Sequence, residues 1–395
     1  MLSFLELTSI LKNATQQIID RAENQKRIIG VQIAKEDCSL DWDDTATPIE
    51  DNIQKVVRHI LKYHFPLCSI DIPEETLVAH IKMLAPKLPM DLLSIFQDAI
   101  CGTITVPQTI LTRLDHAQQR SEKRKTPPII DFWDVDFDTH IGKRKARLGQ
   151  TNQDYFFIGE DGKNALFMVA DGISISNAGS GNLASNIAAQ VISHMWKEEK
   201  ENLRLAPPNK IEELLTNFLY NANYNICESS KNLSKNGIEN DVPMGTTILL
   251  AYAQGSTITL ASLGDSRAYL ITEDGPIILT GDHNVRGEKL RMGLKYEESN
   301  SGNALMRYLG YFNEHFEVAL PKPEICSFDI LPGERLLLCS DGYTDYAAYR
   351  HSDLSMLIRD AMDKPTLASS CNHLIMQANQ GGGGDNITVL IAQAH

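Results

Sequence analysis

The spacing of apolar residues changes along the chain and divides it into two parts. In the first part, apolar residues recur every three or four positions, which is the period of one buried helix face. The clearest set follows Pro48 and comprises Ile49, Ile53, Val56, Val57, Ile60 and Leu61. Thr47, Pro48 and Glu50 supply a helix cap, a first helical residue and a capping box. We therefore predict a small all-helical N-terminal domain over residues 1–116, in which no chemical motif stands out.

A polar, basic stretch follows this region. Residues 117–128 have the sequence AQQRSEKRKTPP, and a charged segment closed by two prolines is typical of an exposed connection between domains. We place a linker at 117–130 and a second domain at 131–395. For the first domain two roles stay open, a regulatory or partner-binding module and a structural cap on the second domain.

Short strand-like runs replace the helical period after the linker. They cover residues 155–158, 165–170, 246–253, 257–262, 268–272, 277–279, 335–339 and 387–392. Helices are expected at 182–200, 210–232, 352–362 and 366–378. Strands in groups, separated by helices in pairs, predict an α+β layered domain and not a regular alternation of strand and helix.

Charge and composition narrow the classes of function. The formal net charge is −14, which argues against nucleic acid as a partner because that affinity rests on clustered Lys and Arg. The apolar runs are shorter than the roughly 18 residues that cross a bilayer, and the N-terminus lacks a cleavable signal pattern. The seven Cys are scattered without a CxxC pair, as expected for reduced thiols. We expect a soluble, cytoplasmic protein with no membrane partner.

Three aspartates lie at the ends of strand-like runs. Asp171 follows the run 165–170, Asp341 comes two residues after the run 335–339, and Asp385 stands two residues before the run 387–392. Carboxylates at strand ends can converge, and Mg²⁺ and Mn²⁺ prefer carboxylate, carbonyl and water oxygens. A single Asp-Gly or Asp-Asn pair is more often a structural turn, so the prediction of a metal site depends on the combination with further motifs.

Those further motifs occur in a fixed order. They are Gly245-Thr246-Thr247, LGDSRAY at 263–269, LTGDH at 279–283 and SDGYTD at 340–345. Together with the three aspartates, the set resembles the metal-dependent protein phosphatase (PPM) family, the type 2C Ser/Thr phosphatases, and looks most like its bacterial members. The resemblance covers about residues 145–392. It implies an αββα fold, a β-sandwich of two antiparallel sheets flanked by helices, with a two-metal site at one end.

The resemblance also implies roles for matching residues. Asp171 would bridge two Mg²⁺ or Mn²⁺ ions, and Asp341 and Asp385 would complete the pair, which makes these three the candidate catalytic residues. Asp265 and Asp345, with Asp341, match residues that hold a third, weaker ion in many bacterial relatives. The full set of candidate metal ligands is Asp154, Asp171, the Gly172 carbonyl, Asp265, Asp341, Asp345 and Asp385.

The sequence departs from the family pattern at the phosphate-binding arginine and in the loop after Asp171. The usual arginine position is Gly149, so Arg147 is the nearest candidate for binding substrate phosphate, with Lys145 and Arg144 as alternatives. Ile173 stands where animal members often have a histidine that acts as general acid. The segment 284–302 would form a flap beside the active site and is our candidate for substrate selection.

The predicted function is a signalling enzyme, a protein Ser/Thr phosphatase whose substrates are phosphoproteins. It would hydrolyse phosphoserine or phosphothreonine by attack of a water activated between two divalent cations. One alternative is a catalytically weak phosphatase-fold regulator that binds a phosphoprotein or partner, suggested by the altered loop at 172–177. The other is a two-metal nuclease or phosphodiesterase, against which the acidic charge counts.

Overall fold

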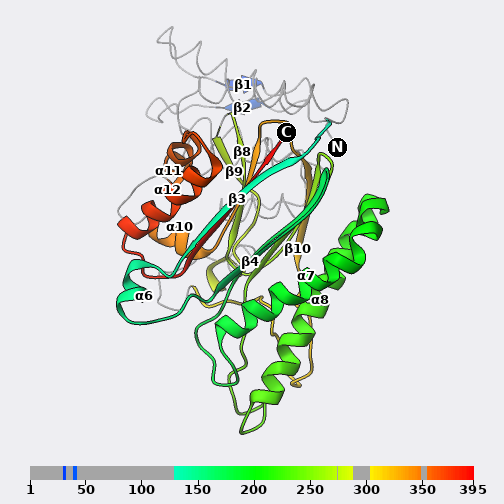
Figure 1. Ribbon diagram of the computed structural model, residues 1–395, viewed down its shortest axis with the longest axis vertical. Helices are drawn as coiled ribbons and strands as arrows, with labels where there is room; N and C mark the ends of the chain where they lie inside the picture. The colour runs from blue at the N-terminus through cyan, green and yellow to red at the C-terminus, as the bar shows by residue number, and fades with distance from the viewer. Residues whose placement is uncertain (1–29, 33–38, 42–128, 274, 288–302, 348–353) are drawn as a thin grey trace. The chain divides into compact units, whose positions relative to one another are not determined.

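The computed structural model describes residues 30–32, 39–41, 129–273, 275–287, 303–347 and 354–395 (Figure 1). The chain divides into two compact units, and all described elements except two short strands belong to the second unit. The linker at 117–130 and the domain boundaries beside it stay predictions. No helix in the described ranges is both long and apolar enough to cross a membrane.

The described residues of the first unit form a pair of short strands. β1 (Gly30–Gln32) and β2 (Ser39–Asp41) pair antiparallel, with Val31 opposite Leu40. The prediction of an all-helical N-terminal domain is therefore wrong at these residues, where a β-branched Val favours a strand. The helix expected after Pro48 lies outside the described residues, as does the rest of 1–116.

The second unit contains two five-stranded antiparallel sheets. The first has the order β10-β7-β6-β5-β4, and its strands are β4 (Asp154–Asp161), β5 (Asn164–Asp171), β6 (Ile248–Gln254), β7 (Thr257–Leu263) and β10 (Glu324–Asp329). The second has the order β3-β12-β11-β8-β9, and its strands are β3 (Trp133–His140), β8 (Arg267–Thr272), β9 (Gly275–Ile278), β11 (Arg335–Cys339) and β12 (Ile387–Ala394).

Helices cover the outer face of each sheet (Figure 1). Two long helices, α7 (Gly181–Leu205) and α8 (Pro208–Leu233), pack on the first sheet. Three shorter ones, α10 (Asp341–Ala347), α11 (Leu354–Met362) and α12 (Leu367–Gln380), lie with the second sheet, and a single-turn helix, α6 (Lys143–Arg147), follows β3. The predicted α+β fold of two antiparallel sheets flanked by helices is confirmed.

The central strands are buried on both faces. In β5, Leu166, Met168 and Ala170 pack in the core beneath α7 and α8, while Phe167 and Val169 alternate with them and are equally buried. A strand enclosed on both faces has an unbroken apolar sequence, which is why the apolar runs located these strands correctly. All eight predicted strands and all four predicted helices are present, with ends shifted by a few residues.

Four described elements of the second unit were not predicted, namely β3, β10, α6 and α10. β3 is an edge strand whose sequence, WDVDFDTH, alternates acidic and apolar residues and is largely half-buried or exposed. β10 is likewise an edge strand with mostly half-buried residues. The helices α6 and α10 have only 5 and 7 residues, too few to show a helical period.

Candidate active site

Asp154 and Asp171 lie opposite each other at one end of the first sheet. They are a directly paired couple in the antiparallel β4–β5 register. Asp154 is 6% exposed, and burial raises its pKa to about 6, with the negative charge of Asp385 adding to the rise. Burial also raises the pKa of Asp171 well above its usual range, and the charges of Asp154, Asp341 and Asp385 add to it.

Asp341 and Asp385 come from the second sheet. Asp341 is the first residue of α10, just after β11, and Asp385 stands just before β12, the antiparallel neighbour of β11. Both therefore lie at the same end of this sheet, where β11 ends and β12 begins. Burial raises the pKa of Asp341 well above its usual range, and the charges of Asp265, Asp385 and Asp345 contribute. The structure thus brings predicted carboxylates from both sheets close enough to affect one another's ionisation.

Asp265 and Asp345 adjoin this group on the Asp341 side. Asp265 lies in the turn between β7 and β8, and Asp345 is four residues after Asp341 on α10. The pKa of Asp265 is raised to about 6, by burial first and then by the charges of Asp282 and Asp345. A hydrogen bond from the Asn284 side chain acts in the opposite direction. Crowding of like charges extends over this second group.

The Gly245-Thr246-Thr247 motif holds the backbone of Asp171. The Thr246 hydroxyl and the Thr247 N–H both donate to the Asp171 carbonyl, each at 2.8 Å. The Asp171 N–H donates to Thr247 Oγ1 at 3.0 Å. The sequence revealed this motif but not its role. The motif holds the backbone of Asp171 with three hydrogen bonds.

Asn386 and Ser340 are positioning residues that the sequence did not single out. The Asn386 amide oxygen accepts from the Gln153 N–H at 3.0 Å, and its nitrogen donates to the Ile141 carbonyl at 2.9 Å. The Ser340 hydroxyl donates to Asp154 Oδ2 at 2.9 Å. These side chains tie the second sheet to the start of β4. The signal available in the sequence was a polar residue directly between an apolar strand and a candidate metal-binding aspartate.

Gly172 follows Asp171 in a place that admits no side chain. Its N–H donates to the Gln153 carbonyl at 3.1 Å, and a Cβ added to Gly172 would lie 2.3 Å from the Gly181 carbonyl oxygen. The start of α7 therefore packs directly on this backbone. The close approach explains the glycine beside Asp171.

Of the three basic candidates, Lys145 is the one that reaches the site. Its side chain is 13% exposed, and its ammonium contacts the Asp385 carboxylate and lies 3.3 Å from Asn386 Oδ1. Arg147, the predicted phosphate-binding residue, is exposed and forms no hydrogen bond or ion pair within the described part of the chain. The α6 turn therefore directs Lys145 inward and Arg147 outward.

The donor atoms of this group suit divalent cations. Asp154 Oδ1 and Asp341 Oδ1 are buried without a hydrogen-bond partner in the described structure, a costly state for carboxylate oxygens that a cation would relieve. Among the described residues, no three His, Cys, Asp or Glu side chains are arranged to hold one ion together. The arrangement fits Mg²⁺ or Mn²⁺ bound by one or two carboxylates each, with water as the remaining ligand.

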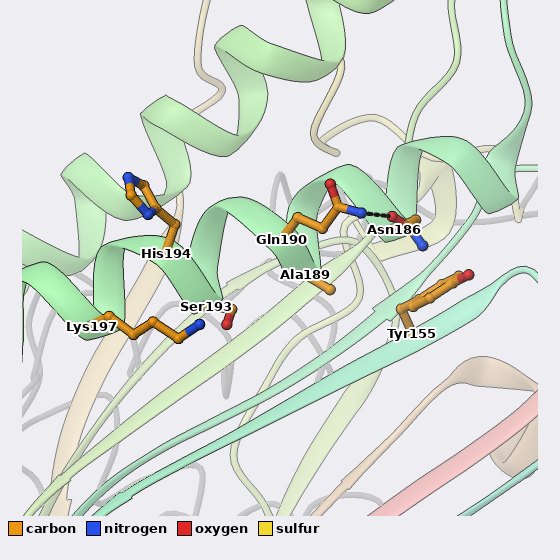
Figure 2. Close-up of a pocket in the computed structure, with 7 residues that line it drawn as sticks. All are labelled: Tyr155, Asn186, Ala189, Gln190, Ser193, His194 and Lys197. Atoms are coloured by element: carbon orange, nitrogen blue, oxygen red, sulfur yellow. Dashed lines mark hydrogen bonds between the residues drawn. The ribbon is translucent and has the colours of Figure 1, made fainter.

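A pocket between α7 and β4 is separate from the carboxylates (Figure 2). It is lined by Tyr155, Asn186, Ala189, Gln190, Ser193, His194 and Lys197. Neighbouring residues of a strand point to opposite faces, so Tyr155 faces α7 while Asp154 faces the acidic group. None of the predicted site residues lines this pocket.

The layered fold and its acidic site are those of a metal-dependent phosphatase. Residues 141–374, more than half of the chain, match the family model for protein phosphatase 2C. The serine/threonine phosphatase stp of Listeria innocua is 32% identical over 260 residues, which are 63% of this chain and 92% of that protein. This chain belongs to the protein phosphatase 2C family of serine/threonine protein phosphatases.

Solved structures agree with this assignment. A serine/threonine phosphatase of S. agalactiae is 25% identical, with a TM-score of 0.56 over 67% of this chain and 100% of that one. The catalytic domain of the phosphatase PstP, solved with 2 manganese ions, is 24% identical and has a TM-score of 0.52 over 67% of this chain and 98% of its own. The second likeness shows the fold alone.

Proposed function

We propose that this enzyme hydrolyses phosphoserine and phosphothreonine in proteins by direct attack of water, with Asp171, Asp341 and Asp385 holding two divalent cations. The single observation that carries the proposal is the crowding of carboxylates from both sheets, where burial and then the charges of neighbouring aspartates raise the pKa values of Asp171 and Asp341. Such an arrangement is unfavourable unless positive charge is added to it. Mg²⁺ and Mn²⁺ match its oxygen donors.

The chain's own residues hold the carboxylates in place. Asp171 lies between Asp154 and Asp341 and is the candidate bridging ligand, with the Gly172 carbonyl beside it. Asp265, Asp341 and Asp345 are the candidate ligands of a third ion, which one or two of them would hold together with water. When bound, the paired ions supply a water of lowered pKa and offset the charge on the phosphoryl oxygens.

Lys145 is the candidate phosphate-binding residue in place of Arg147. Its ammonium lies at Asp385, where positive charge is available both to the carboxylate and to a phosphoryl oxygen. A lysine offers a point charge, whereas an arginine would offer a planar fork to two oxygens. The loop at 172–178 contains no acidic or basic side chain, so the proton for the leaving alkoxide comes from water or from a residue outside this loop.

A small aryl phosphate tests the chemistry without depending on a protein substrate. With added Mn²⁺ the wild type should turn it over, and Asp171→Asn and Asp341→Asn should each lower kcat/KM at least about a thousandfold by removing cation-held charge stabilisation. Asp161→Asn, at the far end of β4 from Asp154, is the matched control and should stay within about twofold, because its half-buried ion pair with Lys200, 3.6 Å between charged atoms, lies at the opposite end of the strand from the candidate site.

Two further comparisons separate the competing functions. Lys145→Met should lower kcat/KM about tenfold to a hundredfold, as loss of one phosphate-binding charge does, while Arg147→Met should leave it unchanged. Faster turnover of a phosphodiester than of a phosphopeptide would indicate a nuclease-like enzyme. A wild type that binds Mn²⁺ and hydrolyses neither substrate would be a regulator with a phosphatase fold.

A further inference from the structure

Two loops beside Asp171 hold each other in a fixed arrangement. The Asn177 and Ala178 N–H groups both donate to the Val242 carbonyl, at 3.1 and 3.2 Å, and the Val242 N–H donates to the Asn177 side chain at 2.6 Å. The Ile173 N–H donates to the Gly245 carbonyl at 2.9 Å. The loops 172–178 and 241–247 therefore form one wall that begins at the candidate bridging aspartate.

This wall is also hydrogen-bonded to the residue that precedes Asp154. The Ser174 hydroxyl donates to Gln153 Oε1 at 2.6 Å, and Gln153 precedes Asp154. Ile175 thus lies between two anchored points, Ser174 on one side and Asn177 on the other. Its position relative to the carboxylates is fixed before any substrate binds.

Apolar side chains project from this wall into solvent. Ile175 is 78% exposed and Val242 is 47% exposed. Burying such side chains against a ligand is favourable in proportion to the area removed from water. Because the backbone is already anchored, little conformational entropy is lost when they are covered.

The wall carries one charged side chain, that of Asp241 at the start of its second loop. The loop 172–178 has no ionisable side chain. Asp241 accepts hydrogen bonds from the Ser234 hydroxyl at 2.8 Å and from the Asn236 side chain at 3.0 Å, so its carboxylate is held within its own turn. The surface next to Asp171 therefore favours an apolar contact.

We propose that Ile175 and Val242 form an apolar subsite for a residue that flanks the phosphorylated Ser or Thr of the substrate. The inference rests on the proposed function, since a substrate whose phosphate reaches Asp171 must pass its neighbouring residues along this wall. The enzyme accordingly prefers phosphosites with a large apolar neighbour. Small phosphate esters, which have no flanking residue, do not use the subsite.

Two phosphothreonine peptides, one with Leu and one with Ser on both sides of the phosphothreonine, test the subsite together with a small aryl phosphate. For the wild type with Mn²⁺, kcat/KM should be about tenfold higher for the Leu peptide, the effect of covering one aliphatic side chain. Ile175→Ala should reduce this ratio to about twofold to threefold, and Val242→Ala should lower it less, since Val242 is less exposed. Turnover of the aryl phosphate should not change in either variant.

The matched control is Leu205→Ala. Leu205 is 76% exposed, nearly as much as Ile175, but it ends the 25-residue helix α7, whose first residue packs on Gly172. At about 1.5 Å per residue it lies roughly 36 Å from the site along the helix axis. This variant should keep the wild-type ratio.

A charged variant at Ile175 tests the proposed subsite in a second, independent way. Ile175→Lys should fold like the wild type because the side chain is exposed, and it should shift the preference towards a peptide with Glu beside the phosphothreonine. The inference is wrong if the wild type does not discriminate between the peptides, or if both Ile175 variants keep its ratio while aryl phosphate turnover persists. Absence of aryl phosphate turnover in the wild type would instead refute the proposed function.

Discussion

Replacing Asp154 by Asn should stabilise the metal-free protein and destabilise the metal-loaded one. Asp154 is almost fully buried beside other carboxylates, and its Oδ1 has no hydrogen-bond partner in the described structure. An Asn keeps the oxygen that accepts from the Ser340 hydroxyl. Its amide can also donate to a neighbouring carboxylate, so the neutral side chain suits the metal-free site better than the charged one.

The magnitude follows from the pKa of the carboxyl group. The pKa of Asp154 is about 6 in the folded protein, whereas an ordinary Asp titrates near about 3.9, and each unit corresponds to about 1.4 kcal/mol. Keeping Asp154 ionised at neutral pH therefore costs about 3 kcal/mol. Removing that cost should raise the melting temperature of the metal-free protein by about 6 °C, since a domain of this size gains roughly 2 °C per kcal/mol.

Thermal unfolding at pH 7.5, in EDTA and again in Mn²⁺, measures both effects. The variant should melt above the wild type in EDTA and should gain less from Mn²⁺, because a candidate ligand has lost its charge. Asp161→Asn at the other end of β4 serves as the control and should move neither curve by more than about 2 °C, since its half-buried ion pair with Lys200 contributes at most about 1 kcal/mol. If Asp154→Asn melts below the wild type in EDTA, the argument from charge crowding is wrong.

The remaining predictions concern pH and packing around the same site. In EDTA, the free energy of unfolding measured in urea should fall by about 3 to 5 kcal/mol as the pH rises from about 4 to 7, because the raised pKa values of Asp154 and Asp265 let the folded state bind more protons in that range. Arg267→Ala should lower the free energy of unfolding by about 2 kcal/mol, since Arg267 donates to both oxygens of Asp282, at 2.9 and 2.8 Å, and a partly buried charge would lose this partner. Gly342→Ala should lower both stability, by about 1 to 3 kcal/mol, and Mn²⁺ affinity measured by calorimetry, because the new Cβ would lie 1.9 Å from the Asn386 carbonyl oxygen.

The central strands were predictable from the sequence because burial on both faces leaves a continuous apolar run, as in β5. Edge strands were not, because their exposed residues do not have to be apolar. In β3, Asp134, Asp136 and Asp138 interrupt the pattern, and nothing local distinguishes such a strand from a polar loop. The N-terminal pair β1–β2 was missed within a region predicted to be all-helical, because strands of three residues are too short to show a period.

The candidate site, too, was predictable from the sequence only in part. Asp171, Asp341 and Asp385 stood out in the sequence because each lies at or near a strand end, whereas Asp154, Asp265 and Asp345 were proposed from the family resemblance alone. The supporting contacts could not be predicted, since they join distant residues, such as the Asn386 side chain with Gln153, 233 positions away. The choice of Lys145 over Arg147 depends on how α6 is turned towards Asp385, and Gly142, with φ of 87°, sets the direction in which that helix starts. Spacing alone does not determine such a direction.

The proposed metal site couples cation binding to folding stability, because the same carboxylates would determine both. An ion that binds only the folded state stabilises it by about 2.7 kcal/mol when its concentration is a hundred times the Kd. That amount is close to the ~3 kcal/mol that the ionised Asp154 costs on its own, so the acidic site is tolerable at neutral pH chiefly when cations are present. Lys145 reduces the charge at Asp385 but leaves Asp154, Asp171 and Asp341 without a cationic partner among the described residues. The site is therefore an unfavourable part of the fold that only added positive charge can offset, and melting temperature should report cation occupancy as directly as activity does.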